Sequence, residues 1–212
     1  MTNRNYEFVT NDTISVNGVT LTRIRAIKDI HWHDVKAGDL GGYIEKYENL
    51  TENAWVSGNA LVFGEARVAG NAWVYDNARV SGNTRVYDNV WVSGNARVYD
   101  SVWVYDNAQV YGNTWVSGNA RVSGDARVSG NAQVYDNAMI QSTTDYITIG
   151  PARSSGRYTT AFVDSEIGVR VVTGCFSGSI SEFNSAIEST HANNEQNLRQ
   201  YRGFVAVIEA SF

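Results

Sequence analysis

A six-residue unit repeats without insertion or deletion between Ile44 and Ile140. Each unit carries a small residue and, two positions later, an aliphatic one, as in Ala54 and Val56. Because side chains alternate across an extended strand, both residues point to the same face. A fixed short period with an aliphatic anchor is typical of a solenoid, and a hexamer predicts a parallel β-helix.

The end of each unit favours a sharp corner. Most units close with Gly-Asn or Asp-Asn, as at Gly58-Asn59 and Asp76-Asn77, and these residues tolerate the backbone conformations that turns need. Three units predict one coil of 18 residues, so the repeat supplies about five to six coils, stacked about 4.8 Å apart. An interior of Ala and Val leaves no room for a ligand, and we therefore expect any function on the outside or at the ends.

The repeat resembles the hexapeptide-repeat family of left-handed parallel β-helices, in which a small residue follows an aliphatic one by four positions. Val56 with Ala60 and Val122 with Ala126 have this spacing. The resemblance implies a left-handed coil with three hexapeptides per turn. Members of the family commonly form trimers with their rods side by side, so it also implies a homo-oligomer, with a trimer favoured.

The register divides the chain into three parts. Residues 1–43 predict an N-terminal β-hairpin cap, since Asn17-Gly18 between apolar stretches is a strong hairpin signal. Residues 44–142 form the repeat. Residues 143–212 predict a small α+β domain, with strands at 146–149, 158–163 and 168–172. A capping-box pattern from Ser179 to Glu182 opens a first helix, and a second begins near Asn194. The expected fold class is mainly β, with both solenoid ends capped.

Composition limits the partners and the compartment. The chain has 17 basic and 22 acidic residues, a net charge of −5, which argues against dedicated nucleic-acid binding. A single cysteine, Cys175, excludes an internal disulfide and suits a reducing cytoplasm. No segment has the length and apolarity of a membrane span. We therefore expect a protein of the bacterial host cytoplasm without a membrane partner.

Tryptophans and arginines occupy the outward columns, in which stacked positions lie 18 residues apart. One column begins with Trp55, Trp73 and Trp91, a second contains Arg79, Arg97 and Trp115, and a third contains Arg67, Arg85, Trp103 and Arg121. Clustered aromatic residues predict an interaction surface, and we assign Trp55, Trp73, Trp91, Trp103 and Trp115 to an interface with a second copy or a partner. The alternative is that these residues have high strand propensity and stack on their own rungs.

A polar loop between the first two C-terminal strands predicts a ligand site. Two guanidinium groups and several hydroxyl groups can hold an anion such as phosphate. The candidate residues are Arg153, Ser154, Ser155, Arg157, Thr159 and Thr160. The segment is not a P-loop, because it lacks the Lys-Ser/Thr pair and the following helix. An ordinary polar hairpin loop is the alternative.

The sequence does not predict a metal, cofactor or catalytic site. His31 and His33 alternate, but His191 is the only other histidine, and a zinc site needs three or four ligands. Cys175 and His191 offer the residue types of a nucleophile and its base. Nothing in the sequence brings them together, and a lone cysteine is more often a small buried residue.

The whole chain resembles a group of phage and prophage proteins, on the segments 36–45, 145–151 and 174–178. The polar loop, the stacked aromatic residues and the lack of a catalytic constellation favour a non-enzymatic, self-associating binding protein, and a phage origin favours interaction with host machinery or sequestration of a small host signal. Its most concrete form is counter-defence, either by sequestering a nucleotide-like signal or by blocking a host protein. One alternative is an acyltransferase of the hexapeptide family, although the repeats contain no histidine and no loop interrupts them. Another is a structural component of the phage particle.

Overall fold

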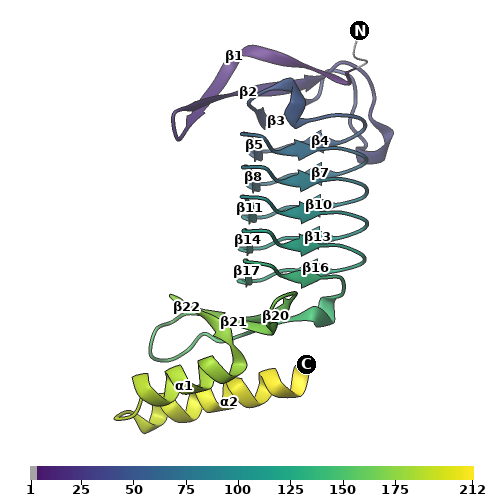
Figure 1. Ribbon diagram of the computed structural model, residues 1–212. Helices are drawn as coiled ribbons and strands as arrows, with labels where there is room; N and C mark the ends of the chain where they lie inside the picture. Colours follow the sequence, from purple (N-terminus) through teal and green to yellow (C-terminus); the bar gives the residue numbers. More distant parts are fainter. Residues whose placement is uncertain (1–3) are drawn as a thin grey trace.

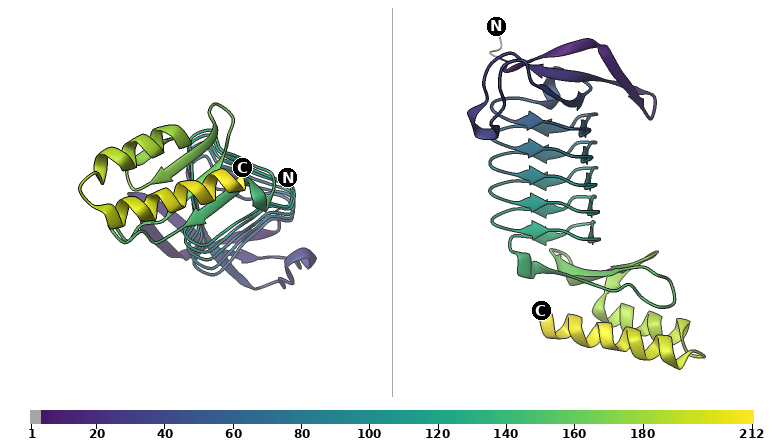
Figure 2. Two further views of the ribbon diagram at one scale, coloured as in Figure 1. Left: turned by 90° about the horizontal axis from the view of Figure 1, so that it is seen from below. Right: turned by 180° about the vertical axis from the view of Figure 1, so that it is seen from behind.

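The structure is a computed structural model that describes residues 4–212 (Figures 1 and 2). The chain begins with a hairpin of β1 (Tyr6–Val16) and β2 (Val19–Ala26), followed by β3 (Leu40–Ile44). Asn17 and Gly18 both have positive φ, 50° and 82°, as a two-residue hairpin turn requires. Val16 therefore pairs with Val19. The hairpin lies across the N-terminal end of the solenoid.

The repeat forms a parallel β-solenoid of about five turns (Figure 1). Each unit contributes a two-residue strand, and neighbouring strands lie 18 residues apart in the sequence, as in the pair Trp55 and Trp73. The strands form three sheets. The first sheet continues through β3 into the hairpin and contains β5 (Leu61–Val62), β8 (Arg79–Val80), β11 (Arg97–Val98), β14 (Trp115–Val116) and β17 (Gln133–Val134). The second sheet contains β4 (Trp55–Val56), β7 (Trp73–Val74), β10 (Trp91–Val92), β13 (Gln109–Val110) and β16 (Arg127–Val128). The third sheet contains β6 (Arg67–Val68), β9 (Arg85–Val86), β12 (Trp103–Val104), β15 (Arg121–Val122) and β18 (Met139–Ile140).

The small and aliphatic positions fill the interior, as predicted. Ala60, Val62 and Val80 have no exposed surface, and the same holds for the equivalent positions of the later turns. Thr84 and Thr114 replace alanine at two inward positions, and each hydroxyl donates to a carbonyl three residues earlier at 2.6 Å. A buried hydroxyl group is tolerated there because it is hydrogen-bonded.

The corners explain why Gly and Asp share one position of the repeat. The backbone there has positive φ, between 56° and 78° at Gly82, Asp88, Asp100 and their equivalents within the repeat. Asp is strained at positive φ, but its carboxylate accepts a hydrogen bond from a backbone N–H one turn further on, as between Asp100 and Gly118 at 3.0 Å. The following Asn side chains form ladders from turn to turn. The corners therefore contribute contacts between turns beyond the strand pairing.

A four-stranded antiparallel sheet closes the C-terminal end of the solenoid. It contains β19 (Tyr146–Ile149), β20 (Thr159–Asp164), β21 (Gly168–Thr173) and β22 (Phe176–Ser179), of which β22 was not predicted. The helices α1 (Ile180–Thr190) and α2 (Glu195–Ser211) lie on the side of the sheet that faces away from the solenoid (Figures 1 and 2).

Side chains alternate between the two faces of each strand, which explains how this sheet packs against both the solenoid and the helices. Phe162 and Val172 belong to the hydrophobic core of the solenoid. Their neighbours Ala161 and Val171 pack with the two helices instead. The sheet is thus covered on both faces, which explains why β20 is buried along nearly its whole length.

The helices begin where the sequence predicts. Ser179 Oγ accepts from the Glu182 N–H, and the Glu182 carboxylate accepts from the Ser179 N–H, which is the predicted capping box. Asn194 caps α2 through its side-chain oxygen. Short 3-10 helices occur at His31–His33, Tyr47–Asn49 and Thr143–Asp145. Neither helix in residues 4–212 is long and apolar enough to cross a membrane.

An ion cluster joins the C-terminal sheet to the last turn of the solenoid. The Arg170 guanidinium lies 2.7 Å from the buried Asp164 carboxylate and 3.2 Å from that of Asp136. Burial alone would raise the pKa of Asp164. The Arg170 hydrogen bond and the N–H groups of Glu166 and Ile167 outweigh burial and lower this pKa. The charged form of Asp164 is therefore the one that the fold stabilises.

This lowered pKa predicts a loss of stability in acid. The contribution of Asp164 is complete above the pKa of an unfolded aspartate, about 3.9, and is lost as the pH falls below it through the folded pKa. We expect Asp164→Asn to lower the free energy of unfolding at pH 7 by about 2 kcal/mol. Urea unfolding at pH 7 and pH 3 measures this: the gap between wild type and variant narrows at pH 3, and an unchanged gap would contradict the assignment.

Candidate ligand-binding face

The predicted tryptophan interface is wrong for Trp55. Its side chain is only 1 % exposed and lies in the same buried cluster as Ile24, Ile30 and Val35. The cause is the N-terminal segment, because the connection between β2 and β3 folds down along the first turns of the solenoid (Figure 1). Trp55 therefore serves the core.

Trp73 is half-buried by the same connection. The His33 ring lies 5.3 Å from its ring, and its indole N–H donates to Ser57 Oγ at 2.9 Å. Burial also lowers the pKa of His33. An indole N–H with a hydrogen-bond partner and a covered ring are features of a packed tryptophan rather than of a free binding surface.

The other three predicted interface residues are exposed but do not share a face. Trp91 is 45 % exposed, Trp103 38 % and Trp115 42 %, and they belong to three different sheets. The ladder of Trp55, Trp73 and Trp91 expected from the sequence is not a continuous exposed patch either, because Trp55 is buried and Trp73 is half-buried.

The predicted anion loop is not assembled as a site. Thr159 and Thr160 are buried in β20, and the Thr160 hydroxyl accepts from the Gln133 N–H of the solenoid. The predicted ligand contact is wrong for both residues, since neither hydroxyl reaches the loop surface. The reason is that β20 is covered on both sides.

The remaining loop residues contact different elements. The Arg153 N–H donates to Gln200 of α2, and Ser154 Oγ lies 3.1 Å from the Tyr201 hydroxyl. Arg157 lies against Gly174 in the turn between β21 and β22, where an added Cβ would come within 2.7 Å of its Nη1. Arg153 lines a shallow groove of about 590 Å³ with Arg199, but the second loop arginine does not line it. Ser155 is exposed, and its hydroxyl accepts from the Arg157 N–H.

A different cluster is formed on the outside of the third sheet, which we call the Arg–Trp face. It consists of Arg67, Arg85, Trp103 and Arg121, one from each of four consecutive turns. The Arg85 guanidinium lies 5.3 Å from the centre of the Trp103 ring, and that of Arg121 lies 5.8 Å from it. Both distances allow a cation–π interaction. Trp103 is thus flanked by arginines from the turns on either side.

Two tyrosines extend the aromatic part of this face. Tyr87 and Tyr105 occupy the next outward column and stack with ring centres 5.4 Å apart and an angle of 8° between their planes. Tyr87 also meets Trp103 edge to face at 6.4 Å. Burial, followed by the neighbouring Tyr105 and acidic groups, raises the pKa of Tyr87.

Two hollows adjoin the same three residues, Arg67, Arg85 and Trp103. The first has a volume of about 270 Å³ and is completed by Ala69, Val86 and Tyr87. The second has a volume of about 380 Å³ and is completed by Glu65, Asn83 and Ser101. One hollow is therefore apolar and aromatic, and the other is polar.

The Arg–Trp face carries three positive charges, of which that of Arg67 is near the Glu65 carboxylate and, after Lys46, contributes to lowering the pKa of this acid. Arg67 and Arg85 are directly paired on neighbouring strands, whose backbones lie about 4.8 Å apart. Like charges in this arrangement repel. No ion pair to either guanidinium occurs within residues 4–212. The nearby Glu65 carboxylate is held by Lys46 at 2.6 Å, which lowers the pKa of Glu65.

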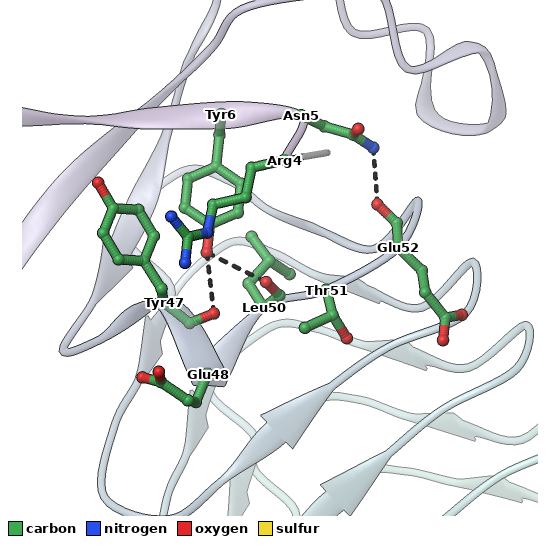
Figure 3. Close-up of a pocket in the computed structure, with 8 residues that line it drawn as sticks. All are labelled: Arg4, Asn5, Tyr6, Tyr47, Glu48, Leu50, Thr51 and Glu52. Atoms are coloured by element: carbon green, nitrogen blue, oxygen red, sulfur yellow. Dashed lines mark hydrogen bonds between the residues drawn. The ribbon is translucent and has the colours of Figure 1, made fainter. Parts of the chain in front are cut away.

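A further pocket, of about 310 Å³, lies at the N-terminal rim of the solenoid (Figure 3). The buried Tyr6 hydroxyl donates to the carbonyls of Leu50 and Tyr47, and burial raises the pKa of Tyr6. The Arg4 guanidinium stacks on the Tyr47 ring at 3.8 Å. These groups are satisfied by one another, so the pocket fits a structural contact between the hairpin and the first turn.

The remaining candidate residues lie apart from these sites. Cys175 is exposed, and the His191 ring stacks on Tyr201 at 5.0 Å. Within residues 4–212, no group of three or more His, Cys, Asp or Glu side chains has an arrangement that could hold a metal ion.

The fold and the repeated faces define a β-solenoid repeat protein. Segments of the repeat match the family model described as YdcK beta solenoid repeat, at residues 72–88, 90–106, 116–130, 120–133 and 132–142. These segments include the turns that carry Arg85, Trp103 and Arg121. No curated protein shows a significant match to this chain.

Proposed function

We propose that this protein is a non-enzymatic binding protein whose Arg–Trp face takes an anionic ligand. The observation that carries the proposal is the pair Arg67 and Arg85, which lie on adjacent turns, form no ion pair within residues 4–212 and border two hollows. Two neighbouring guanidinium groups can bind one phosphate or carboxylate with charge-assisted hydrogen bonds. An anion held between them also removes their mutual repulsion.

The residue types on the Arg–Trp face support a binding role over an enzymatic one. The Arg–Trp face offers no histidine, cysteine or paired carboxylates that could act as base or nucleophile. What it offers is positive charge, aromatic surface and a rigid frame, since its side chains extend from paired strands. Sites on regular elements hold their side chains more precisely than sites on loops.

The proposal also covers the handedness of the solenoid, the source of the protein and its oligomeric state. We take the solenoid as left-handed with three hexapeptides per turn, in keeping with the 18-residue pairing offset, and its source as a phage or prophage acting in the host cytoplasm. The exposed Trp91 and Trp115 favour self-association, with a trimer preferred. A native mass equal to one 23.4 kDa chain would contradict the self-association.

The test replaces both arginines and measures binding of a simple anion. We expect wild-type protein to bind inorganic pyrophosphate in calorimetry, and Arg67→Gln with Arg85→Gln to weaken binding at least about 100-fold. This magnitude follows from about 1.5–3 kcal/mol for each hydrogen bond to a charged group.

A matched control is available on the first sheet. Arg79 and Arg97 are paired in the same way and are followed by Trp115, and Arg97 lies 5.1 Å from the Trp115 ring. Arg79→Gln with Arg97→Gln changes the charge of the protein equally, and we expect it to alter pyrophosphate binding less than twofold. Equal losses in both double variants would show a general charge effect and contradict the proposed site.

A further inference from the structure

We propose that the ligand of the Arg–Trp face is a nucleoside phosphate, with its base in the aromatic hollow and its phosphate between Arg67 and Arg85. This inference rests on the proposed function and names the chemical class of its ligand. Three kinds of recognition chemistry adjoin one another on this face, and a nucleotide is a small molecule that needs all three.

The aromatic hollow suits a flat ring. It is lined by Tyr87 and Trp103, with Ala69 leaving space between the turns. Tyr87 is held by its stack with Tyr105 and by its edge contact with Trp103, so its orientation is fixed before a ligand arrives. A base stacked on such aromatic residues gains binding energy whatever its identity.

The phosphate position follows from what the two hollows share. Arg67 and Arg85 border both of them, and their guanidinium groups supply neighbouring donors. The acid that lines the polar hollow with them, Glu65, is paired with Lys46. Arg85 also lies over Trp103. A single ligand can therefore contact the aromatic surface and the charge at the same time.

The sugar is bonded to both the base and the phosphate, so it lies between them, and the polar hollow suits its hydroxyl groups. Asn83 offers an amide, Ser101 a hydroxyl and Glu65 a carboxylate held by Lys46. Amide, hydroxyl and carboxylate groups together can donate to and accept from neighbouring hydroxyls. Inorganic phosphate alone would leave this hollow and the aromatic hollow unused.

The experiment compares the parts of the ligand with the whole by calorimetry. The probes are adenosine 5′-monophosphate, adenosine and inorganic phosphate. We expect the nucleotide to bind at least about tenfold more tightly than either of the other two, since stacking and charge both contribute. We expect Tyr87→Ala to reduce nucleotide affinity about tenfold and to leave phosphate binding unchanged.

A second variant and a control keep the test independent of folding. Ala69→Leu fills the aromatic hollow without removing a contact, and we expect the same selective loss. Tyr99→Ala removes the tyrosine at the corresponding position of the first sheet, after Arg97 and Val98, and we expect no change in nucleotide binding.

The outcomes separate this inference from the proposed function. If inorganic phosphate and the nucleotide bind equally well, and both need Arg67 and Arg85, the nucleoside phosphate is excluded while the anion site stands. If adenosine binds as tightly as the nucleotide, the placement of the phosphate is wrong. Affinity that rises with the length of an oligonucleotide would overturn the assignment to a single nucleotide. If neither pyrophosphate nor the nucleotide binds, both proposals fail.

Discussion

Phe162→Ala is expected to lower the free energy of unfolding by about 3–5 kcal/mol, the range for removing a buried aromatic ring. Phe162 has no exposed surface and belongs to the core of the solenoid although it lies in the C-terminal sheet. Its ring meets Tyr135 of the last turn at 6.3 Å. The substitution removes the contact that seals the end of the solenoid, and urea unfolding followed by circular dichroism measures the loss.

The control is Phe212→Ala at the end of α2. Phe212 is exposed, so we expect a change within about 0.5 kcal/mol. If Phe162→Ala also costs less than about 1 kcal/mol, the C-terminal sheet does not cap the solenoid as the structure indicates.

Gly82→Ala is expected to lower the free energy of unfolding by about 3 kcal/mol. Gly82 has a φ of +70°, and an added Cβ would lie 2.7 Å from the backbone nitrogen of Asp100 in the next turn. The positive φ alone costs about 1–2 kcal/mol for a residue with a Cβ. The close approach costs more, because the backbone of a neighbouring turn must move. Thermal unfolding of wild type and variant measures the difference.

Gly130→Ala separates these two causes. Gly130 has nearly the same φ, +72°, but no atom lies within 4 Å of an added Cβ, since the stack of corners ends there. We expect a loss of about 1 kcal/mol. Equal losses at Gly82 and Gly130 would show that contact between turns at the corners is not tight.

The sequence predicts the solenoid well because its interior obeys a strict rule. A strand period of two and a unit of six place Ala60, Val62 and their equivalents on one face, and the corner residues occur at fixed offsets. The helix caps were equally local, since Ser179 and Glu182 act within one turn. Features set by neighbours in the sequence were therefore predictable.

The errors arose where distant segments meet. Trp55 has the same place in its unit as Trp91, but the connection between β2 and β3 covers only the first turns. The periodicity of the repeat contains no information on that contact. Thr159 and Thr160 are consecutive residues of a predicted strand, so their side chains point to opposite faces of the sheet. Both are buried because the sheet is covered on both sides. The sequence did not predict that the sheet lies between the solenoid and the helices.

The Arg–Trp face could be predicted only in part from the sequence. The 18-residue offset aligns Arg67, Arg85 and Trp103 in one column, but the same order occurs in Arg79, Arg97 and Trp115. What distinguishes the two columns is the neighbouring column, where Tyr87 and Tyr105 stack in one case and Tyr99 stands between Ser81 and Ser117 in the other. Side-chain positions were needed to show the hollows beside Trp103.

The most direct test of the ligand-binding face follows the tryptophan side chains individually. The chain has six tryptophans, so the indole N–H signals of ¹⁵N-labelled protein can be assigned with single Trp→Phe variants and followed during titration with inorganic pyrophosphate. We expect the Trp103 signal to shift, while those of Trp55 and Trp115 stay in place. Six unchanged signals, or a shift of Trp115 without one of Trp103, would contradict the assignment of the site to the third sheet.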